Sequence, residues 1–261
     1  MDNKYTAIIV EPRKHSALEF VLNNFLENLN NDWNIIIYHG KKNKIYIKKI
    51  INTKLQQYIN RITCINLNVD NLSINDYNNL MTNKEFINSI PTEIFLIFQT
   101  DTMICEQHKN LIYNFLQYDY VGGPWKKNHT YGNIILDDQV GNGGLSLRRK
   151  SKMLEILNKC YYNKNGEYNE DIYFSLGCND IIINKPSYKE ALNFSIEEVY
   201  NDKNFGVHKS WNHFNNDLIN KQCKNYNKLV YLNKNDKNDN ILIYILIIIV
   251  LLFIIYLCHK K

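Results

Sequence analysis

Residues 94–102 read IFLIFQTDT, in which five consecutive apolar residues are followed by a cluster of small polar ones. An apolar run of this length is typical of a strand buried on both faces at the centre of a sheet. Open α/β sheets bind their ligands at the carboxyl ends of such strands. We therefore expect Gln99, Thr100 and Asp101 to lie at a functional site, although Asp101 on its own could simply cap the next segment.

Strand and helix signals alternate on both sides of this run. Strand-like stretches cover residues 5–10, 33–38 and 62–67, amphipathic or helical ones cover 15–29, 45–58 and 150–159, and residues 73–90 favour one or two helices. This alternation predicts βαβ units, and hence an α/β fold with a largely parallel sheet flanked by helices.

A glycine-rich segment, GNGG at residues 141–144, precedes a strand-like stretch at 145–148. We expect the segment to be a flexible loop at which a ligand can approach the backbone. It has neither the GxGxxG spacing nor the lysine of a P-loop, which argues against a dinucleotide-binding or P-loop fold.

The C-terminal part of the chain has a different character. Residues 241–258 read ILIYILIIIVLLFIIYLC, without a charge or a helix breaker, and would cover roughly 27 Å as a helix. We predict a domain at residues 1–232, a polar tether at 233–240 and one transmembrane helix at 241–258. The N-terminus has no apolar signal region, so we expect the domain to be in the cytoplasm, although lysines on both flanks of the span leave its orientation open.

Charge and cysteine content narrow the class of partner. The 261-residue chain has a formal net charge of +5 but no long basic run, which argues against a nucleic-acid-binding arm. Its six cysteines lie far apart, without the spacing of a zinc site. We expect reduced thiols in a cytosol-like compartment.

Further polar residues are candidates for chemistry, each with a simpler alternative. Glu170 and Asp171 stand at the start of a predicted helix, where acidic residues also complement the helix dipole. His208 lies near an aromatic residue and could be a packed core histidine. Asp137 and Asp138 fit a solvated loop better than a catalytic pair.

Taken together and in this order, five segments resemble the nucleotide-sugar glycosyltransferases of GT-A fold. They are AIIVEPRKH (7–15), FLIFQTDT (95–102), VGNGGLSLRRKSKM (140–153), NEDIYFS (169–175) and FGVHKSW (205–211). They are also similar to a glycosyltransferase-like family known mainly from giant viruses. The resemblance covers residues 5–211 and implies a GT-A-like, mostly parallel mixed sheet. It also implies transfer of a sugar from a nucleotide-diphosphate donor to a hydroxyl acceptor.

The resemblance also implies roles for individual residues. Asp101 would be the last carboxylate of an Asp-x-Asp motif and His208 a second ligand of a Mn²⁺ or Mg²⁺ ion, with Gln99 departing from the motif. Asp171 would be the catalytic base, and Glu170 would position the acceptor. The donor would contact Glu11, Pro12, Arg13, Gln99, Thr100, Asp101, Gly143, Gly144 and Lys209, with Ser146 near the sugar or the acceptor.

Two function classes follow from this comparison. The first is a membrane-anchored glycosyltransferase acting on a glycan, a glycoprotein or a lipid-linked acceptor. The second is a catalytically silent relative that binds a nucleotide-sugar or glycan as a membrane-tethered interaction module. The neutral Gln99 favours the second class, whereas Asp101, Asp171 and His208 favour the first.

Overall fold

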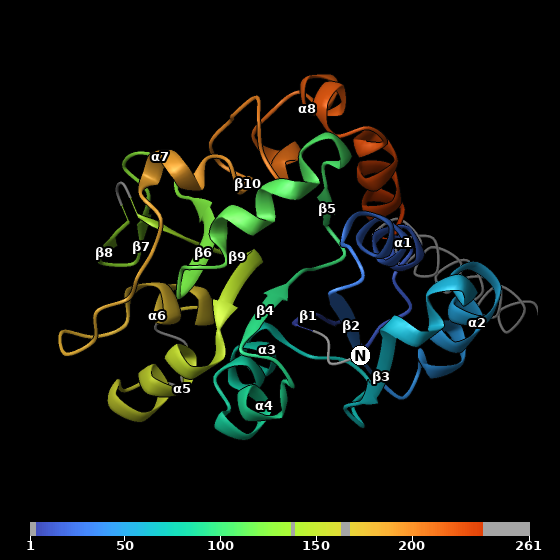
Figure 1. Cartoon of the computed structure of the whole chain (residues 1–261), viewed down its shortest axis with the longest axis horizontal. Coiled ribbons are helices and arrows are strands. Elements are labelled where there is room, and N and C mark those ends of the chain that lie inside the picture. Colours follow the sequence, from blue (N-terminus) through green and yellow to red (C-terminus); the bar gives the residue numbers. More distant parts are fainter. Residues whose placement is uncertain (1–3, 137–138, 163–167, 237–261) are drawn as a thin grey trace, which may run out of the picture.

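A six-stranded sheet runs through the computed structural model, which describes residues 4–136, 139–162 and 168–236 (Figure 1). The strand order is β3-β2-β1-β4-β9-β6. The strands are β1 (Tyr5–Val10), β2 (Trp33–His39), β3 (Ile62–Asn66), β4 (Ile94–Ile97), β6 (Tyr120–Pro124) and β9 (Val140–Arg149). β3, β2, β1 and β4 are parallel, and β9 is antiparallel to its neighbours β4 and β6. The predicted mixed, mostly parallel α/β sheet is confirmed, with the apolar strand β4 in its interior.

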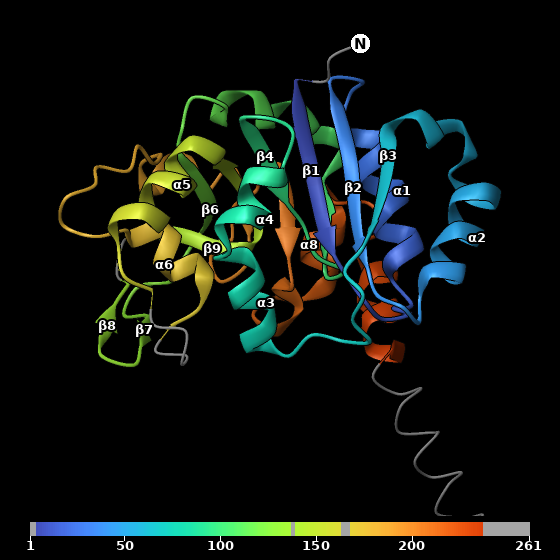
Figure 2. The same cartoon turned by 90° about the horizontal axis from the view of Figure 1, so that it is seen from below.

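Helices cover both faces of this sheet (Figure 2). They are α1 (Leu18–Asn28), α2 (Lys44–Lys54), α3 (Ile74–Met81), α4 (Lys84–Ser89), α5 (Lys150–Lys159), α6 (Glu170–Leu176), α7 (Tyr188–Ala191) and α8 (Asn216–Gln222). Three 3₁₀ helices are η1 (Gln56–Arg61), η2 (Glu106–Phe115) and η3 (Ser210–Asn212). Residues 226–236 are also helical.

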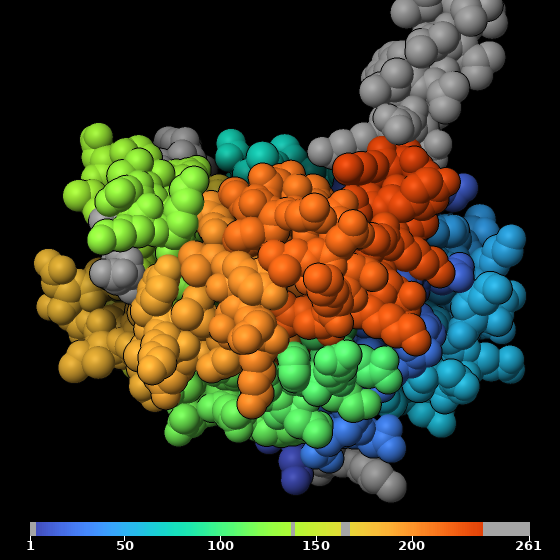
Figure 3. Space-filling view, turned by 90° about the horizontal axis from the view of Figure 1, so that it is seen from above, coloured from blue at the N-terminus to red at the C-terminus, as the bar shows by residue number. Residues whose placement is uncertain are grey.

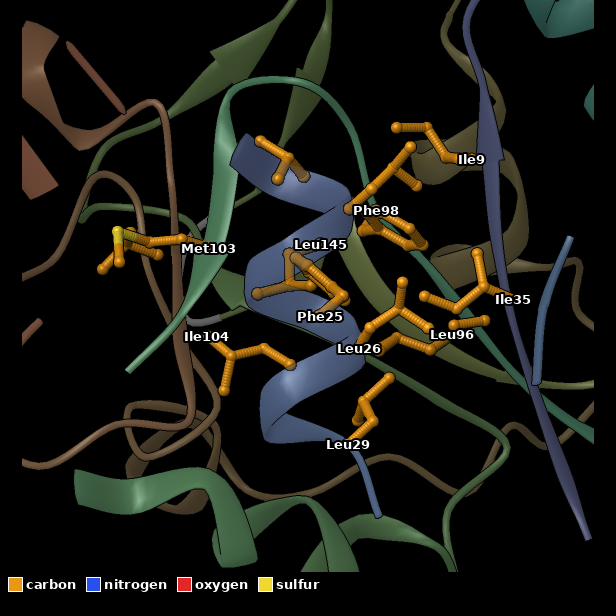
Figure 4. Packing of buried hydrophobic residues seen from close by; sticks show 14 of the residues in the cluster. Ile9, Phe25, Leu26, Leu29, Ile35, Leu96, Phe98, Met103, Ile104 and Leu145 are labelled. Atoms are coloured by element: carbon orange, nitrogen blue, oxygen red, sulfur yellow. The ribbon is translucent and has the colours of Figure 1, made fainter. Parts of the chain in front are cut away.

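The core divides into two large clusters because neighbouring residues of a strand point to opposite faces. Ile9 on β1 faces the α1 side, and Ile8 faces the side of α3, α4 and α5. On the α1 side, Phe25 stacks on Phe98 with ring centroids 3.9 Å apart, and Leu96 lies close by (Figure 4). Such burial of apolar side chains on both faces fixes β4, and therefore the polar residues that follow it, in the middle of the molecule.

Local capping explains why residues 73–90 form two helices. Ser73 and Asp76 form a capping box at the start of α3, and the Asn83 side chain accepts a hydrogen bond from Phe86 N at 2.9 Å to begin α4. The second cap interrupts what would otherwise be one helix.

A smaller sheet lies at the end of the main one. Its order is β10 (Ser195–Ile196), β11 (Gly206–His208) and β5 (Thr102–Ile104), and β7 (Thr130–Tyr131) pairs with β8 (Ile134–Ile135) in a separate hairpin. β5 directly follows the turn after β4, and its antiparallel pairing places His208 opposite Thr102. This pairing brings the end of β11, with His208, to the carboxyl end of β4, although the two strands are distant in the sequence.

The glycine-rich segment differs from its prediction as a flexible loop. Residues 141–144 belong to the ten-residue strand β9 and are buried. Glycine has low strand propensity, so the sequence pattern favoured a loop. The strand forms because it pairs with β4 and β6, and its glycines let other parts of the chain approach its backbone closely.

Two predictions fall on residues outside the described part of the chain. Asp137 and Asp138 lie there, and so does the predicted transmembrane helix at 241–258. Within residues 4–136, 139–162 and 168–236, no helix has the length and apolar character needed to span a membrane.

The expectation of reduced thiols is wrong for four cysteines. Cys105 pairs with Cys223, and Cys160 pairs with Cys178. The partners lie 118 and 18 residues apart in the sequence, so linear spacing could not show that the fold brings their Cα atoms within 4.4 and 5.6 Å. Cys64 is free and exposed.

Candidate functional site

A cleft of about 520 Å³ opens at the carboxyl ends of β1 and β4. It is lined by the predicted residues Glu11, Pro12, Arg13, Gln99, Thr100, Asp101, Glu170, Asp171, His208 and Lys209. The predicted residues Gly143 and Gly144 lie behind this wall, on β9. The volume is in the range of small-molecule sites. The structure thus brings together the segments that the sequence singled out.

His208 lies between two carboxylates. Its Nε2 is 3.4 Å from Asp101 Oδ1, and its Nδ1 forms a 2.7 Å hydrogen bond with Glu197 Oε2. Asp101 Oδ1 is buried and has no hydrogen-bond partner within the described residues. Burial lowers the pKa of His208, but Glu197 and Asp101 outweigh it and raise that pKa well above its usual value. Burial likewise opposes the charge of Asp101, yet His208 holds the pKa of Asp101 below its usual value. The carboxylates of Asp101 and Glu197 therefore favour a positive charge between them, at the position of His208.

The geometry of Asp101 and His208 suits a bound cation. Ligands of one Mg²⁺ lie about 2.1 Å from the ion, so neighbouring ligands in an octahedron are roughly 3 Å apart. The 3.4 Å between Asp101 Oδ1 and His208 Nε2 is close to that spacing. Metal-binding histidines commonly donate their other ring N–H to a carboxylate, which is the position that Glu197 occupies. Within the described residues, no three His, Cys, Asp or Glu side chains form a complete metal site.

Asp171 is held at the start of α6 by two backbone N–H groups. Its Oδ2 accepts a hydrogen bond from Gly143 N at 3.0 Å, and its Oδ1 accepts one from Ile172 N at 2.8 Å. Burial, and then the neighbouring charge of Glu170, raise the pKa of Asp171 to about 7. A carboxylate with this pKa exists in both protonation states near neutral pH, as a proton acceptor in catalysis requires.

The two glycines of β9 allow Asp171 and His208 to approach the strand. A Cβ on Gly143 would lie 2.4 Å from Asp171 Cβ, and a Cβ on Gly144 would lie 2.1 Å from the His208 ring. Any side chain at either position would displace one of these residues. The glycines thus position the residues of the cleft from behind.

Glu170 is engaged in a buried ion pair. Both of its carboxylate oxygens bind Arg148, with Oε2 at 2.5 Å from Nη1 and Oε1 at 3.1 Å from Nη2. The Arg148 side chain is fully buried, stacks over the Tyr120 ring, and donates to Ser146 Oγ at 3.0 Å. Ser146 in turn donates to Gly143 O. This network ties the first turn of α6 to β9, directly beneath Asp171.

At the β1 side of the cleft, Glu11 orients Arg13. Arg13 Nε and Nη2 donate to the two Glu11 oxygens at 2.9 and 2.8 Å, while the Arg13 side chain stays about half exposed. The buried Asn43 donates to the carbonyls of both residues and so fixes the turn after β1. The exposed guanidinium therefore projects from a well-ordered turn.

Lys209 and Gln99 complete the cleft. Lys209 is exposed and has a left-handed backbone with φ of 45°, and its N–H donates to Asp101 O at 3.0 Å. A non-glycine residue in this conformation is uncommon and is often found at functional sites. Gln99 Nε2 lies 3.5 Å from the hydroxyl of Tyr77 on α3.

Sequence reasoning missed Glu197, Arg148 and Tyr77. Glu197 follows a strand of only two residues, and it meets His208 only because β10 pairs with β11. Arg148 begins the basic run RRK at residues 148–150, which suggests a solvated surface. The apolar–polar alternation along residues 145–148 was the available signal, because it places Ser146 and Arg148 on one face of the strand.

A family model described as "Protein of unknown function (DUF5672)" matches residues 61–208. This stretch contains Gln99, Asp101, Asp171 and His208, and so most of the cleft.

Solved glycosyltransferases are similar in fold. The apo structure of the bifunctional glycosyltransferase WbbM has a TM-score of 0.55 at 8% identity, covering 90% of this chain and 50% of that one. The mannosyltransferase PcManGT from Pyrobaculum calidifontis, in complex with GDP-Man and Mn²⁺, has a TM-score of 0.47 at 10% identity, covering 70% and 54%. S. aureus TarS has a TM-score of 0.46 at 12% identity, covering 78% and 36%.

The likeness to WbbM shows the fold alone. The chain is a mixed α/β protein similar to GT-A-type glycosyltransferases, as the sequence predicts. It spans about a third to just over a half of the length of these three proteins.

Proposed function

The chain belongs to the family described as "Protein of unknown function (DUF5672)", and from its fold and its cleft we propose that it is a nucleotide-sugar-dependent glycosyltransferase. One observation carries the proposal: Asp171, with a pKa of about 7, shares a cleft with the Asp101–His208 pair at the carboxyl edge of the sheet. A proton acceptor and a site for a cation next to a diphosphate are the two functions that this reaction requires.

In the proposed reaction Asp171 accepts the proton of an acceptor hydroxyl. The hydroxyl oxygen forms a bond to the anomeric carbon of the sugar, and the bond from that carbon to the diphosphate oxygen breaks. The proton ends on Asp171, and the nucleoside diphosphate leaves with the electron pair. The backbone N–H groups of Gly143 and Ile172 hold the Asp171 carboxylate in place for this transfer.

Asp101 and His208 would hold a Mn²⁺ or Mg²⁺ ion, which, when bound, neutralises the charge of the diphosphate. Glu197 would keep His208 Nε2 directed toward the ion through its hydrogen bond to Nδ1. Lys209 follows His208 and lines the same cleft, and we assign it to a phosphate oxygen. We assign Arg13, with Glu11, Pro12, Gln99 and Thr100, to binding of the donor in the same cleft.

For the acceptor we favour a glycan carried on a lipid. Asn233, in the last described helix, donates to Thr100 O at 3.0 Å, so the cleft lies near the point where the chain continues toward residues 241–258. If those residues span a membrane, the cleft is held close to its surface. The side of the membrane on which the domain lies stays a prediction.

The second candidate is a silent relative that binds a nucleotide-sugar or a glycan without transferring a sugar. Gln99 supports it, because its amide replaces a carboxylate and lies beside the Tyr77 hydroxyl rather than next to His208. Only the glycosyltransferase turns a donor over, so a measurement of donor turnover separates the two candidates.

The first test is thermal unfolding of the full chain in detergent with UDP-, GDP- and CMP-sugars, each with and without Mn²⁺. A donor at a hundred times its Kd stabilises the fold by about 2.7 kcal/mol, which raises the Tm by roughly 5–10 °C. We expect this rise to require Mn²⁺ and to disappear in Asp101→Ala. Folded protein that responds to no nucleotide-sugar would contradict the glycosyltransferase and leave only the glycan-binding form of the second candidate. Donor binding without donor turnover in any acceptor screen would support the second candidate.

A second prediction concerns Glu197. Glu197→Gln removes the carboxylate that orients His208, and we expect Mn²⁺ affinity to fall by about 10–100-fold. The measurement is the free Mn²⁺ signal by electron paramagnetic resonance during titration. Glu198→Gln is the matched control, because Glu198 pairs with His129 instead and should leave the affinity unchanged. Equal affinities for both variants would remove Glu197 from the site.

A further inference from the structure

The helix α2 and the turn before it form a basic surface outside the catalytic cleft, next to the turn that carries Glu11 and Arg13. Between Trp33 and Val69 the chain has no Asp or Glu. Six lysines in this stretch are exposed: Lys41, Lys42, Lys44, Lys48, Lys49 and Lys54. Only Lys42 has an ion-pair partner among the described residues, namely Asp70 at 2.9 Å. We call these six residues the α2 basic face.

Apolar groups accompany this charge. Ile45, on the same helix, is 85% exposed. Next to it, a hollow of about 310 Å³ between α2 and the edge strand β3 is lined by Ile47, Ile51 and Cys64, with Lys44 and Lys48 also on its wall. An exposed isoleucine and an apolar hollow beside lysines are complementary to an anionic lipid, which has a charged headgroup and apolar chains. A nucleic acid backbone has no apolar part to match them.

The last described residues lie next to this face. Asp236 accepts a hydrogen bond from Ser16 N at 2.9 Å, and Tyr46 of α2 donates to the carbonyl of the neighbouring His15 at 3.4 Å. Lys228 and Leu232 of the last helix share a groove with Tyr46 and Lys54 of α2. Figure 3 shows the red surface of this helix beside the blue surface of the N-terminal third.

The chain between this point and the apolar segment is short. Ile241 is five residues beyond Asp236, and five residues span at most about 18 Å. If residues 241–258 enter a bilayer, α2 is therefore held close to its surface.

From these observations we propose that the α2 basic face is a membrane-docking surface that binds anionic phospholipid. The lysines contact the headgroups, Ile45 enters the interface, and the hollow beside Cys64 receives apolar lipid atoms. Together with the C-terminal segment, this second contact fixes the orientation of the domain, and so of its cleft, relative to the bilayer. The proposal concerns a surface outside the cleft and does not depend on catalysis.

The test uses Cys64 as a reporter, in the full chain with Cys258→Ser so that Cys64 is its remaining unpaired cysteine. The protein is reconstituted in vesicles of phosphatidylcholine alone or with about 30% phosphatidylserine. The measured quantity is the rate at which Cys64 reacts with a charged, membrane-impermeant maleimide. We expect the rate to be about tenfold lower in the anionic vesicles, and Lys48→Glu/Lys49→Glu to restore it.

The matched control is Lys126→Glu/Lys127→Glu, an adjacent exposed lysine pair before β7, at the opposite end of the molecule from α2 (Figure 1). It should leave the protection of Cys64 intact. Protection that is equal in both vesicles, or that survives Lys48→Glu/Lys49→Glu, overturns the proposal. Loss of duplex DNA or RNA binding in that variant with unchanged Cys64 protection would instead assign the face to nucleic acid. Nucleotide-sugar binding by the same variants stays unchanged, so this proposal and the proposed function fail separately.

Discussion

Asp171→Asn should lower the turnover number by about 10²–10⁴-fold while leaving donor binding intact, because it removes the proposed proton acceptor but keeps the shape of the side chain. The asparagine can still accept one of the two backbone hydrogen bonds, from Gly143 N or Ile172 N. The measurement is release of nucleoside diphosphate from the donor found by thermal unfolding, with and without acceptor.

The pH dependence of the wild-type protein gives a sharper form of this prediction. With a pKa of about 7, Asp171 is mostly protonated at pH 6, so kcat/KM should fall about tenfold for each pH unit below 7 and level off above it. An unperturbed aspartate, with a pKa near 3.9, would give a flat profile from about pH 5 to 8. A flat profile would therefore contradict the assignment of Asp171 as the base.

Stability provides the control for folding in this experiment. Because burial raises its pKa, the folded chain holds a proton on Asp171 that the unfolded chain releases between about pH 4 and 7. The unfolding free energy therefore decreases as pH rises through this window. Asparagine does not ionise, so Asp171→Asn avoids the free-energy cost of a buried carboxylate. At pH 8 this variant should be at least as stable as the wild type. An unstable variant would mean that lost activity reflects misfolding.

The sequence predicts most of the fold because its strands and helices follow regular periodicities. The apolar run at Ile94–Ile97 is the interior strand β4, and the alternation around it forms the parallel part of the sheet. It also predicts which residues meet at the cleft, because the carboxyl ends of parallel strands lie at one edge of a sheet. Asp101 and Glu11 come together for this reason.

The rest of the site depends on contacts that periodicity does not encode. Glu197 reaches His208 only through the pairing of two very short strands, β10 and β11. Positions 143 and 144 of this strand require glycine because Asp171 and His208 occupy the space that side chains would fill. The disulfide partners Cys105 and Cys223 meet only in the folded chain. Each is a long-range packing relation between segments with weak local signals.

Breaking the buried ion pair of Arg148 and Glu170 should have the largest effect on stability of the variants proposed for this site. Arg148→Met leaves the Glu170 carboxylate buried without its partner, which typically costs about 3–5 kcal/mol. For a domain of this size the Tm should fall by roughly 6–20 °C. The measurement is thermal unfolding followed by circular dichroism, and Arg149→Met, which removes a partly exposed arginine paired with Asp119, is the control with a much smaller loss.

The double variant Arg148→Met/Glu170→Met separates charge pairing from packing. Replacing both members of a buried ion pair with apolar residues is often neutral for stability, so we expect most of the loss to be recovered. A double variant as unstable as Arg148→Met would contradict this expectation.

The same double variant also tests the role of Glu170 in the cleft. Glu170 raises the pKa of Asp171 more than Arg148 lowers it, so removing both should move the pH midpoint of kcat/KM below 7. If instead KM for the acceptor rises and the midpoint stays in place, Glu170 contacts the acceptor, as its resemblance to the acidic motif of the GT-A enzymes implies.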